Sequence, residues 1–234
     1  MPRETFERNL RKLQDDVLVL GSMVEKTIVE AVDILKRQDL QAARRLIAAD
    51  QLINQKRFAI ENDTLVLIAT QQPMAGDLRA LAAILEIATE LERMGDYAKG
   101  IAKITLMIGE KPLLKPLIDI PRMAEKSRDM LHRALDAFMR GDVELARAIP
   151  TEDAEVDALY DQVYRELLTY IISDPRTIDQ ATHLLWVAHN LERTADRVSN
   201  ICERVVFSVT GEMAEMGLEE HEVEGLKGST ATLD

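Results

Sequence analysis

One six-residue pattern occurs twice in this chain, one hundred positions apart. Leu91-Glu92-Arg93-Met94-Gly95-Asp96 returns as Leu191-Glu192-Arg193-Thr194-Ala195-Asp196. Both copies lie in long stretches with an apolar residue at every third or fourth position, which is the spacing of an amphipathic helix. At an offset of 103, Asp39, Ala43, Arg44 and Asp50 return as Asp142, Ala146, Arg147 and Asp153. The second half of the chain is therefore a copy of the first.

The apolar spacing and its interruptions predict three helices in each copy. Aromatic residues make up only 4% of the 234 residues, and alternating β-branched stretches are missing, so the fold class is all-α. Pro150 stands where the first copy has Ile47, and a proline inside a helix predicts a distortion just before Asp153. We expect helices over residues 6–35, 40–70, 74–108, 124–140, 142–172 and 176–209, with a proline-containing linker over residues 110–121.

Charge is distributed unevenly along the chain. The net charge is −12, and residues 211–234 carry seven acidic residues against one lysine, so we expect residues 212–234 to form a flexible acidic tail. The remainder has no basic stripe, which argues against nucleic acid as a partner. No stretch is apolar enough to span a membrane, and no signal peptide is recognisable, so we expect a cytoplasmic protein. Cys202 is the only cysteine, and we expect a buried, inert thiol.

Each copy carries acidic pairs at helical spacing. Residues four apart share one face of a helix, and the second and third helices of each copy should lie antiparallel because a short turn joins them. The pairs on these helices are Asp50 with Asn54 and Glu92 with Asp96 in the first copy, and Asp153 with Asp157 and Glu192 with Asp196 in the second. Oxygen ligands of this kind suit hard cations such as Mg, Ca, Mn or iron. The sequence therefore predicts a metal site in each bundle.

Two other interpretations remain open. Acidic residues on an amphipathic helix commonly form a solvated face, and Arg93 and Arg193 could neutralise Asp96 and Asp196 from three residues away. A di-iron enzyme would use Glu-x-x-His motifs on its helices. None of the four histidines has a glutamate three residues before it, which argues against an oxidase of that kind.

The two motifs, with Ile101-Ala102 after the first and Arg197-Val198-Ser199-Asn200-Ile201 after the second, resemble the paired motifs of the PhoU family. The resemblance extends from the first helix to about residue 209. It implies two pseudo-symmetric three-helix bundles, residues 1–110 and 111–211, in a homodimeric, non-enzymatic regulator of phosphate uptake. Such regulators repress the phosphate-starvation response as adapters between the ATPase subunit of a phosphate ABC transporter and a sensor histidine kinase.

The resemblance also implies bound divalent or trivalent metal ions, among them iron, zinc, manganese or magnesium. Gly100 stands where the second copy has Asn200, and Asn54 where it has Asp157, so we expect the first site to be the weaker one. The alternatives are a metal-free scaffold that binds basic partners and a carboxylate-metal enzyme. The metal ligands expected by position are Asp50, Asn54, Glu92, Asp96, Asp153, Asp157, Glu192, Asp196 and Asn200.

Overall fold

The computed structural model describes residues 2–213 and 216, and it contains no strand in that part of the chain. The first half forms α1 (Pro2–Arg37), α2 (Leu40–Gln71) and α3 (Ala75–Ile108). The second half forms α4 (Asp119–Arg140), α5 (Val143–Ala148), α6 (Asp153–Ser173) and α7 (Ile178–Thr210). Short 3₁₀ turns, η1 (Ile149–Glu152) and η2 (Pro175–Thr177), precede α6 and α7. The all-α prediction is confirmed.

Equivalent aspartates begin the second helix of each copy. The side chain of Asp39 accepts a hydrogen bond of 2.8 Å from the backbone N–H of Ala42, and that of Asp142 accepts one of 3.0 Å from Leu145. These bonds satisfy backbone donors that have no partner within the helix. The sequence offset of 103 therefore corresponds to the same capping structure in both halves.

The proline at position 150 interrupts the second helix of the second copy, as predicted. The α-helix that begins at Val143 ends at Ala148, and the 3₁₀ turn η1 carries the chain to Asp153, where α6 starts. Proline lacks the N–H that an α-helix needs at this point. The predicted location of Pro121 in the linker is wrong, because this residue lies in the first turn of α4. A first-turn proline is tolerated, since the N–H there has no helical partner.

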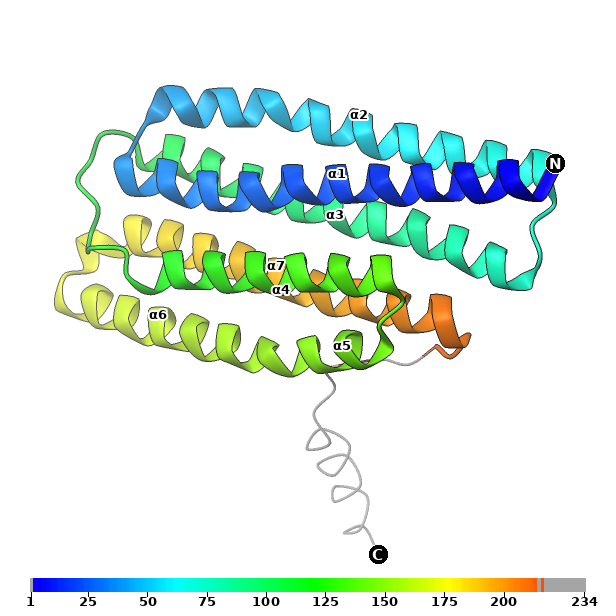
Figure 1. Ribbon diagram of the computed structural model, residues 1–234. Coiled ribbons are helices and arrows are strands. Elements are labelled where there is room, and N and C mark those ends of the chain that lie inside the picture. The colour runs from blue at the N-terminus through cyan, green and yellow to red at the C-terminus, as the bar shows by residue number, and fades with distance from the viewer. Residues whose placement is uncertain (1, 214–215, 217–234) are drawn as a thin grey trace, which may run out of the picture.

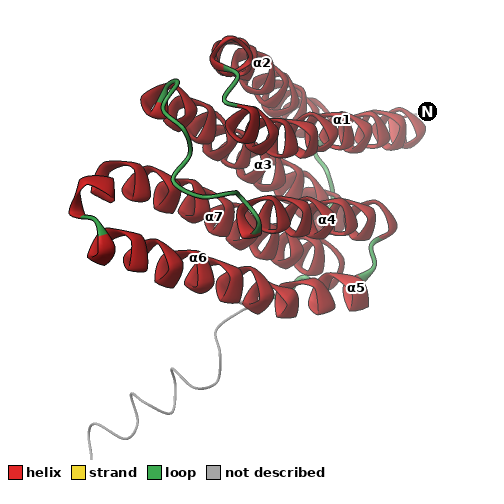
Figure 2. Cartoon of the chain, turned by 90° about the vertical axis from the view of Figure 1, so that its left-hand side faces the viewer, coloured by secondary structure: helices red, strands yellow, loops and turns green. Residues whose placement is uncertain are grey.

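The two bundles lie side by side and share one apolar core. In Figure 1, α2 and α6 form the outer edges, and α1, α3, α4 and α7 lie between them. Figure 2 shows the same helices closer to end-on, with α1 and α3 facing α4 and α7. Packing between α3 and α7 is the most extensive of any pair, and α1 also packs on α4. The buried apolar residues form a single cluster, so the two bundles are not two independent cores.

The interface between α3 and α7 shows the symmetry of the duplication. Glu90 of α3 accepts a hydrogen bond of 3.2 Å from the amide of Asn200 of α7. At the offset of 100, Glu90 corresponds to Asn190 and Asn200 corresponds to Gly100. These two residues also meet, since a Cβ at Gly100 would lie 3.2 Å from the amide nitrogen of Asn190. The same two positions therefore meet on both sides of a pseudo-twofold axis. A Cβ at Gly100 would therefore require the amide of Asn190 to shift by a few tenths of an ångström.

The segment after α7 remains in contact with the second bundle. The backbone N–H of Met216 donates a hydrogen bond of 2.8 Å to Glu203, and its side chain packs on the core. The predicted flexible tail, residues 212–234, lies mostly outside the described residues. None of the helices in the described part of the chain has the length and apolarity needed to cross a bilayer.

Candidate metal centres

In the first bundle, a lysine lies between the predicted acidic ligands. The ammonium of Lys99 is 2.7 Å from Asp50 Oδ2 and 2.6 Å from Asp96 Oδ1, so it joins α2 to α3. Asn54 also donates a hydrogen bond of 3.1 Å to Asp50. Burial by itself lowers the pKa of Lys99, but its hydrogen bonds to the two aspartates outweigh this effect and leave that pKa above its usual value. The carboxylates of this cluster are therefore already paired with a cation.

Glu92 is the remaining acidic residue of the first cluster. Burial is the main cause that raises its pKa, followed by the negative charge of Asp96. The charges of Arg57 and Lys99 act in the opposite direction. Two basic side chains, one from each helix, consequently accompany the three carboxylates of the first bundle.

The second bundle gathers the four predicted carboxylates without a bridging lysine. Burial raises the pKa of Asp153 to about 7, and repulsion from Asp157, Asp196 and Glu192 adds to the shift. Burial, and then repulsion from Asp196, also raises the pKa of Glu192. Asp153 Oδ1 and Glu192 Oε2 are both buried and accept no hydrogen bond within the described part of the chain. Buried carboxylate oxygens without a hydrogen bond are costly unless a cation or a proton compensates them.

Two basic side chains lie at the edge of the second cluster. Arg193 is 3.0 Å from Asp196, and His189 Nδ1 is 3.2 Å from Glu192 Oε2, although that contact lacks hydrogen-bond geometry. Both belong to α7 itself, three residues from their partners, so neither connects α6 to α7. The predicted neutralisation of Asp196 by Arg193 is thus confirmed, while Arg93 pairs instead with Glu90 at 2.5 Å.

Asn200 is directed toward the first bundle in this structure. Its amide nitrogen donates to Glu90, and Arg197 lies 3.3 Å from the same carboxylate. Glu90 is only 8% exposed, so these contacts form a polar cluster in the α3–α7 interface. The repeat did not predict this cluster, because position 90 is occupied by Glu in one copy and Asn in the other.

The carboxylate oxygens of the second bundle are ligands that suit a hard cation, but they are not arranged around a single point. Within residues 2–213 and 216, no three Asp, Glu, His or Cys side chains are placed so that they could hold one ion. Asp153, Glu192 and Asp196 supply oxygen donors of the kind that Mg, Mn or iron prefer. A cation in the second bundle would therefore require these carboxylates to come closer together.

Aligning the copies by their offsets shows which basic residues distinguish the two clusters. Lys99 corresponds to Ser199 in the third helix, and Arg57 corresponds to Tyr160 in the second. Both basic residues of the first cluster are therefore neutral in the second copy. Their helical spacing from Asp96 and Asn54 was visible in the sequence, and a comparison of basic residues between the copies would have identified them.

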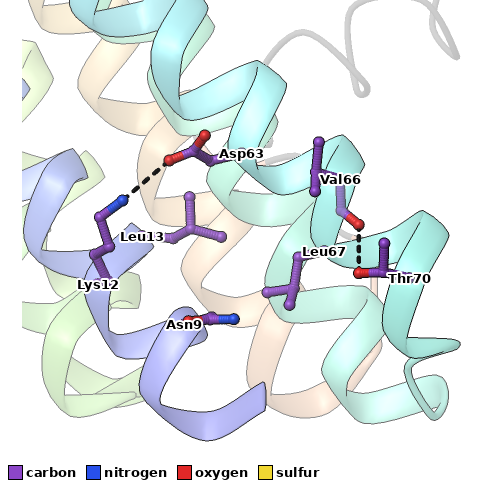
Figure 3. A pocket seen from close by; sticks show the side chains of 7 residues that line it. All are labelled: Asn9, Lys12, Leu13, Asp63, Val66, Leu67 and Thr70. Atoms are coloured by element: carbon purple, nitrogen blue, oxygen red, sulfur yellow. Dashed lines mark hydrogen bonds and ion pairs between the residues drawn. The ribbon is translucent and has the colours of Figure 1, made fainter. Parts of the chain in front are cut away.

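Two further features of the molecule lie apart from the carboxylate clusters. A cavity of about 190 Å³ lies between α1 and α2 (Figure 3), where Lys12 pairs with Asp63 at 3.1 Å. Asp63 is thirteen residues from Asp50, or about 20 Å along α2, so this cavity is separate from the carboxylates. Cys202 is buried, and burial raises the pKa of its thiol to about 12, which confirms the expected inert cysteine.

The fold and the clusters define the class of protein: a duplicated helical-bundle protein with a carboxylate cluster between two helices of each copy. Comparison with known proteins then identifies the family. The family model for the PhoU domain matches residues 17–105 and, separately, residues 120–205. The chain belongs to the PhoU family, and the resemblance seen in its sequence is confirmed.

Similar proteins cover nearly the whole chain. The phosphate-specific transport system accessory protein PhoU homolog of Caulobacter vibrioides is 38% identical, over 89% of this chain and 91% of its own length. The accessory protein PhoU of Escherichia coli is 35% identical, over 88% and 86%. The crystal structure of the phosphate transport system regulatory protein PhoU from Streptococcus pneumoniae matches with a TM-score of 0.83 and 34% identity. That match covers 90% of this chain and all of the other.

Proposed function

We propose that this protein is a non-enzymatic regulatory accessory protein of a phosphate-specific transport system. The observation that carries the proposal is the family membership of both halves, together with accessory proteins of phosphate-specific transport systems that match about nine-tenths of the chain. As a regulator, the protein would limit phosphate uptake and repress the phosphate-starvation response when phosphate is plentiful. Its partners would be the ATPase subunit of a phosphate ABC transporter and a sensor histidine kinase, which it would contact as a cytoplasmic homodimer.

We also propose that the second bundle contributes a metal site to this regulator. Asp153, Glu192 and Asp196 would hold a hard divalent or trivalent cation, with Asp157 beside them. Support comes from the two buried carboxylate oxygens without hydrogen bonds and from the mutual repulsion that raises the pKa of Asp153. A bound cation would turn this repulsion into attraction and so stabilise the folded state. The metal would serve to fix α6 against α7.

A gene deletion tests the regulatory role most directly. Cells that lack the protein should express alkaline phosphatase in phosphate-replete medium, and a plasmid-borne copy should restore repression. Complementation with Asp196→Asn tests the metal site, and Asp136→Asn, which changes a half-buried aspartate of α4, is the matched control. Unchanged alkaline phosphatase in the deletion strain would contradict the regulatory role.

A metal-free scaffold is the second candidate function. It is favoured by the open arrangement of the carboxylates and by the pair between Arg193 and Asp196. In a scaffold, the acidic face of α6 and α7 would bind a basic surface of a partner protein. Elemental analysis of protein purified without chelator separates the two, since the scaffold contains no stoichiometric metal.

A further inference from the structure

The two copies differ in the positive charge that lies between their acidic residues. Lys99 extends from α3 and contacts Asp96 on its own helix and Asp50 on α2. Asp50 is 7% exposed, and the lysine side chain is 22% exposed, so the pair is largely shielded from water. Ammonium–carboxylate hydrogen bonds in such a place are short and stronger than those between neutral groups. The ammonium therefore joins the two helices as a bound cation would.

The second copy offers nothing equivalent to this ammonium. Ser199 occupies the matching position, is buried, and its hydroxyl makes no hydrogen bond within the described residues. A serine hydroxyl carries no charge, so it cannot neutralise a carboxylate as an ammonium does. Asp153, the counterpart of Asp50, accordingly keeps one buried oxygen without a hydrogen bond. The exchange of Arg57 for Tyr160 removes a second positive charge near the cluster.

We infer that Lys99 is the built-in cation of the first bundle, so that its ammonium takes the place of a metal ion there and confines metal binding by this chain to the second bundle. The part about the second bundle rests on the proposed function, whereas the role of Lys99 in the first bundle does not. The link between α2 and α3 would then persist at any metal concentration, and only the link between α6 and α7 would respond to metal supply.

Manganese binding by the full-length protein tests this inference. The chain is stripped with a chelator, and Mn²⁺ alone is titrated while free Mn²⁺ is followed by electron paramagnetic resonance. Lys99→Met removes the ammonium but keeps an unbranched side chain, and it should bind one more Mn²⁺ per chain than the wild type. Lys103→Met, one turn further along α3 and exposed, is the matched control and should show no gain. Adding Asp96→Asn to Lys99→Met should remove the gained site.

The outcomes separate this inference from the proposed metal function. A wild type that binds no Mn²⁺, together with a gain in Lys99→Met, would reject the metal site of the second bundle but support the role of Lys99. A Lys99→Met protein that is folded and gains no Mn²⁺ would overturn the inference. Lys99→Ser, which introduces the residue of the second copy, guards against a folding defect. If either variant folds only when Mn²⁺ is present, the inference is also supported. If neither variant binds additional Mn²⁺, whether folded or not, the inference is overturned.

Discussion

In the first bundle, Asp50 and Asp96 share the ammonium of Lys99, whereas in the second their counterparts Asp153 and Asp196 share no lysine. The order of the helices, the aspartate that caps the second helix and the four-residue spacing of the paired side chains are shared by both bundles, although η1 interrupts the second helix of the second one. The difference shows that duplication preserved the framework while a few neighbouring side chains decided the charge state of each cluster. The consequence is visible in Asp153, whose pKa is raised to about 7 because burial and three nearby carboxylates oppose its ionisation.

The largest effect is expected at the interface where the copies meet. Glu90→Ala removes the carboxylate that pairs with Arg197 and accepts from Asn200. Breaking a mostly buried ion pair leaves an uncompensated charge, so we expect a loss of about 3 kcal/mol in the free energy of unfolding. Asn190→Ala, the equivalent change in the second copy, should cost only about 1 kcal/mol or less because no charge is left unpaired. Urea unfolding measures both, and equal losses would contradict the asymmetry.

Metal addition should stabilise the protein through the second bundle. At a Mn²⁺ concentration about one hundred times the dissociation constant, linkage predicts about 2.7 kcal/mol, or roughly 5–10 °C in melting temperature. Asp196→Asn should abolish most of this increase, whereas the matching Asp96→Asn should retain it, since Asp96 already pairs with Lys99. Thermal unfolding of both variants, with Mn²⁺ and with a chelator, measures these changes. An equal loss in both variants would show that the first bundle also binds metal.

The pH dependence of the metal-free protein should come from Asp153. The folded-state pKa of this acid is raised from 3.8 to about 7, so the folded protein binds the proton more tightly than the unfolded chain. Stability should therefore fall as the pH rises from about 4 to about 7, and Asp153→Asn should remove this fall. At pH 7.5 that variant should be more stable than the wild type by about 1–2 kcal/mol, because partial exposure reduces the effect of the full shift.

Asp50→Asn serves as the opposite case for the first bundle. It leaves the ammonium of Lys99 with one carboxylate fewer, so it should destabilise the protein at pH 7.5. Chemical unfolding in the presence of a chelator, over the pH range 5–8, distinguishes the two variants. A destabilising Asp153→Asn would mean that the second cluster is compensated by a positive charge as the first is.

The smallest effect concerns the segment that follows α7. A chain ending at Gly211 loses the packing of Met216 and its hydrogen bond to Glu203, which should cost about 1 kcal/mol. A chain ending at Met216 lacks only the acidic residues 217–234, and its melting temperature should equal that of the full chain. If the chain ending at Met216 melted at a lower temperature than the full chain, residues 217–234 would be shown to stabilise the bundle.

The sequence by itself determined the helices and their duplication, because these depend on local spacing. Capping by Asp39 and Asp142, the proline interruption before Asp153 and the burial of Cys202 could all be predicted from neighbouring residues. The acidic pairs could also be placed on one face of each helix, since residues four apart always share a face. Those relations hold for any helix, whatever packs against it.

Only the tertiary structure decided what each acidic residue contacts. Lys99 reaches Asp50 because α2 and α3 pack at one particular distance and register, and no spacing along the chain contains that information. Asn200 meets Glu90 rather than a carboxylate of its own bundle because α3 packs against α7 in the shared core. A contact between helices depends on the packing of many side chains at once, whereas helix position depends on a few residues in sequence. The framework of the clusters was therefore predictable from the sequence, and the partner of each carboxylate was not.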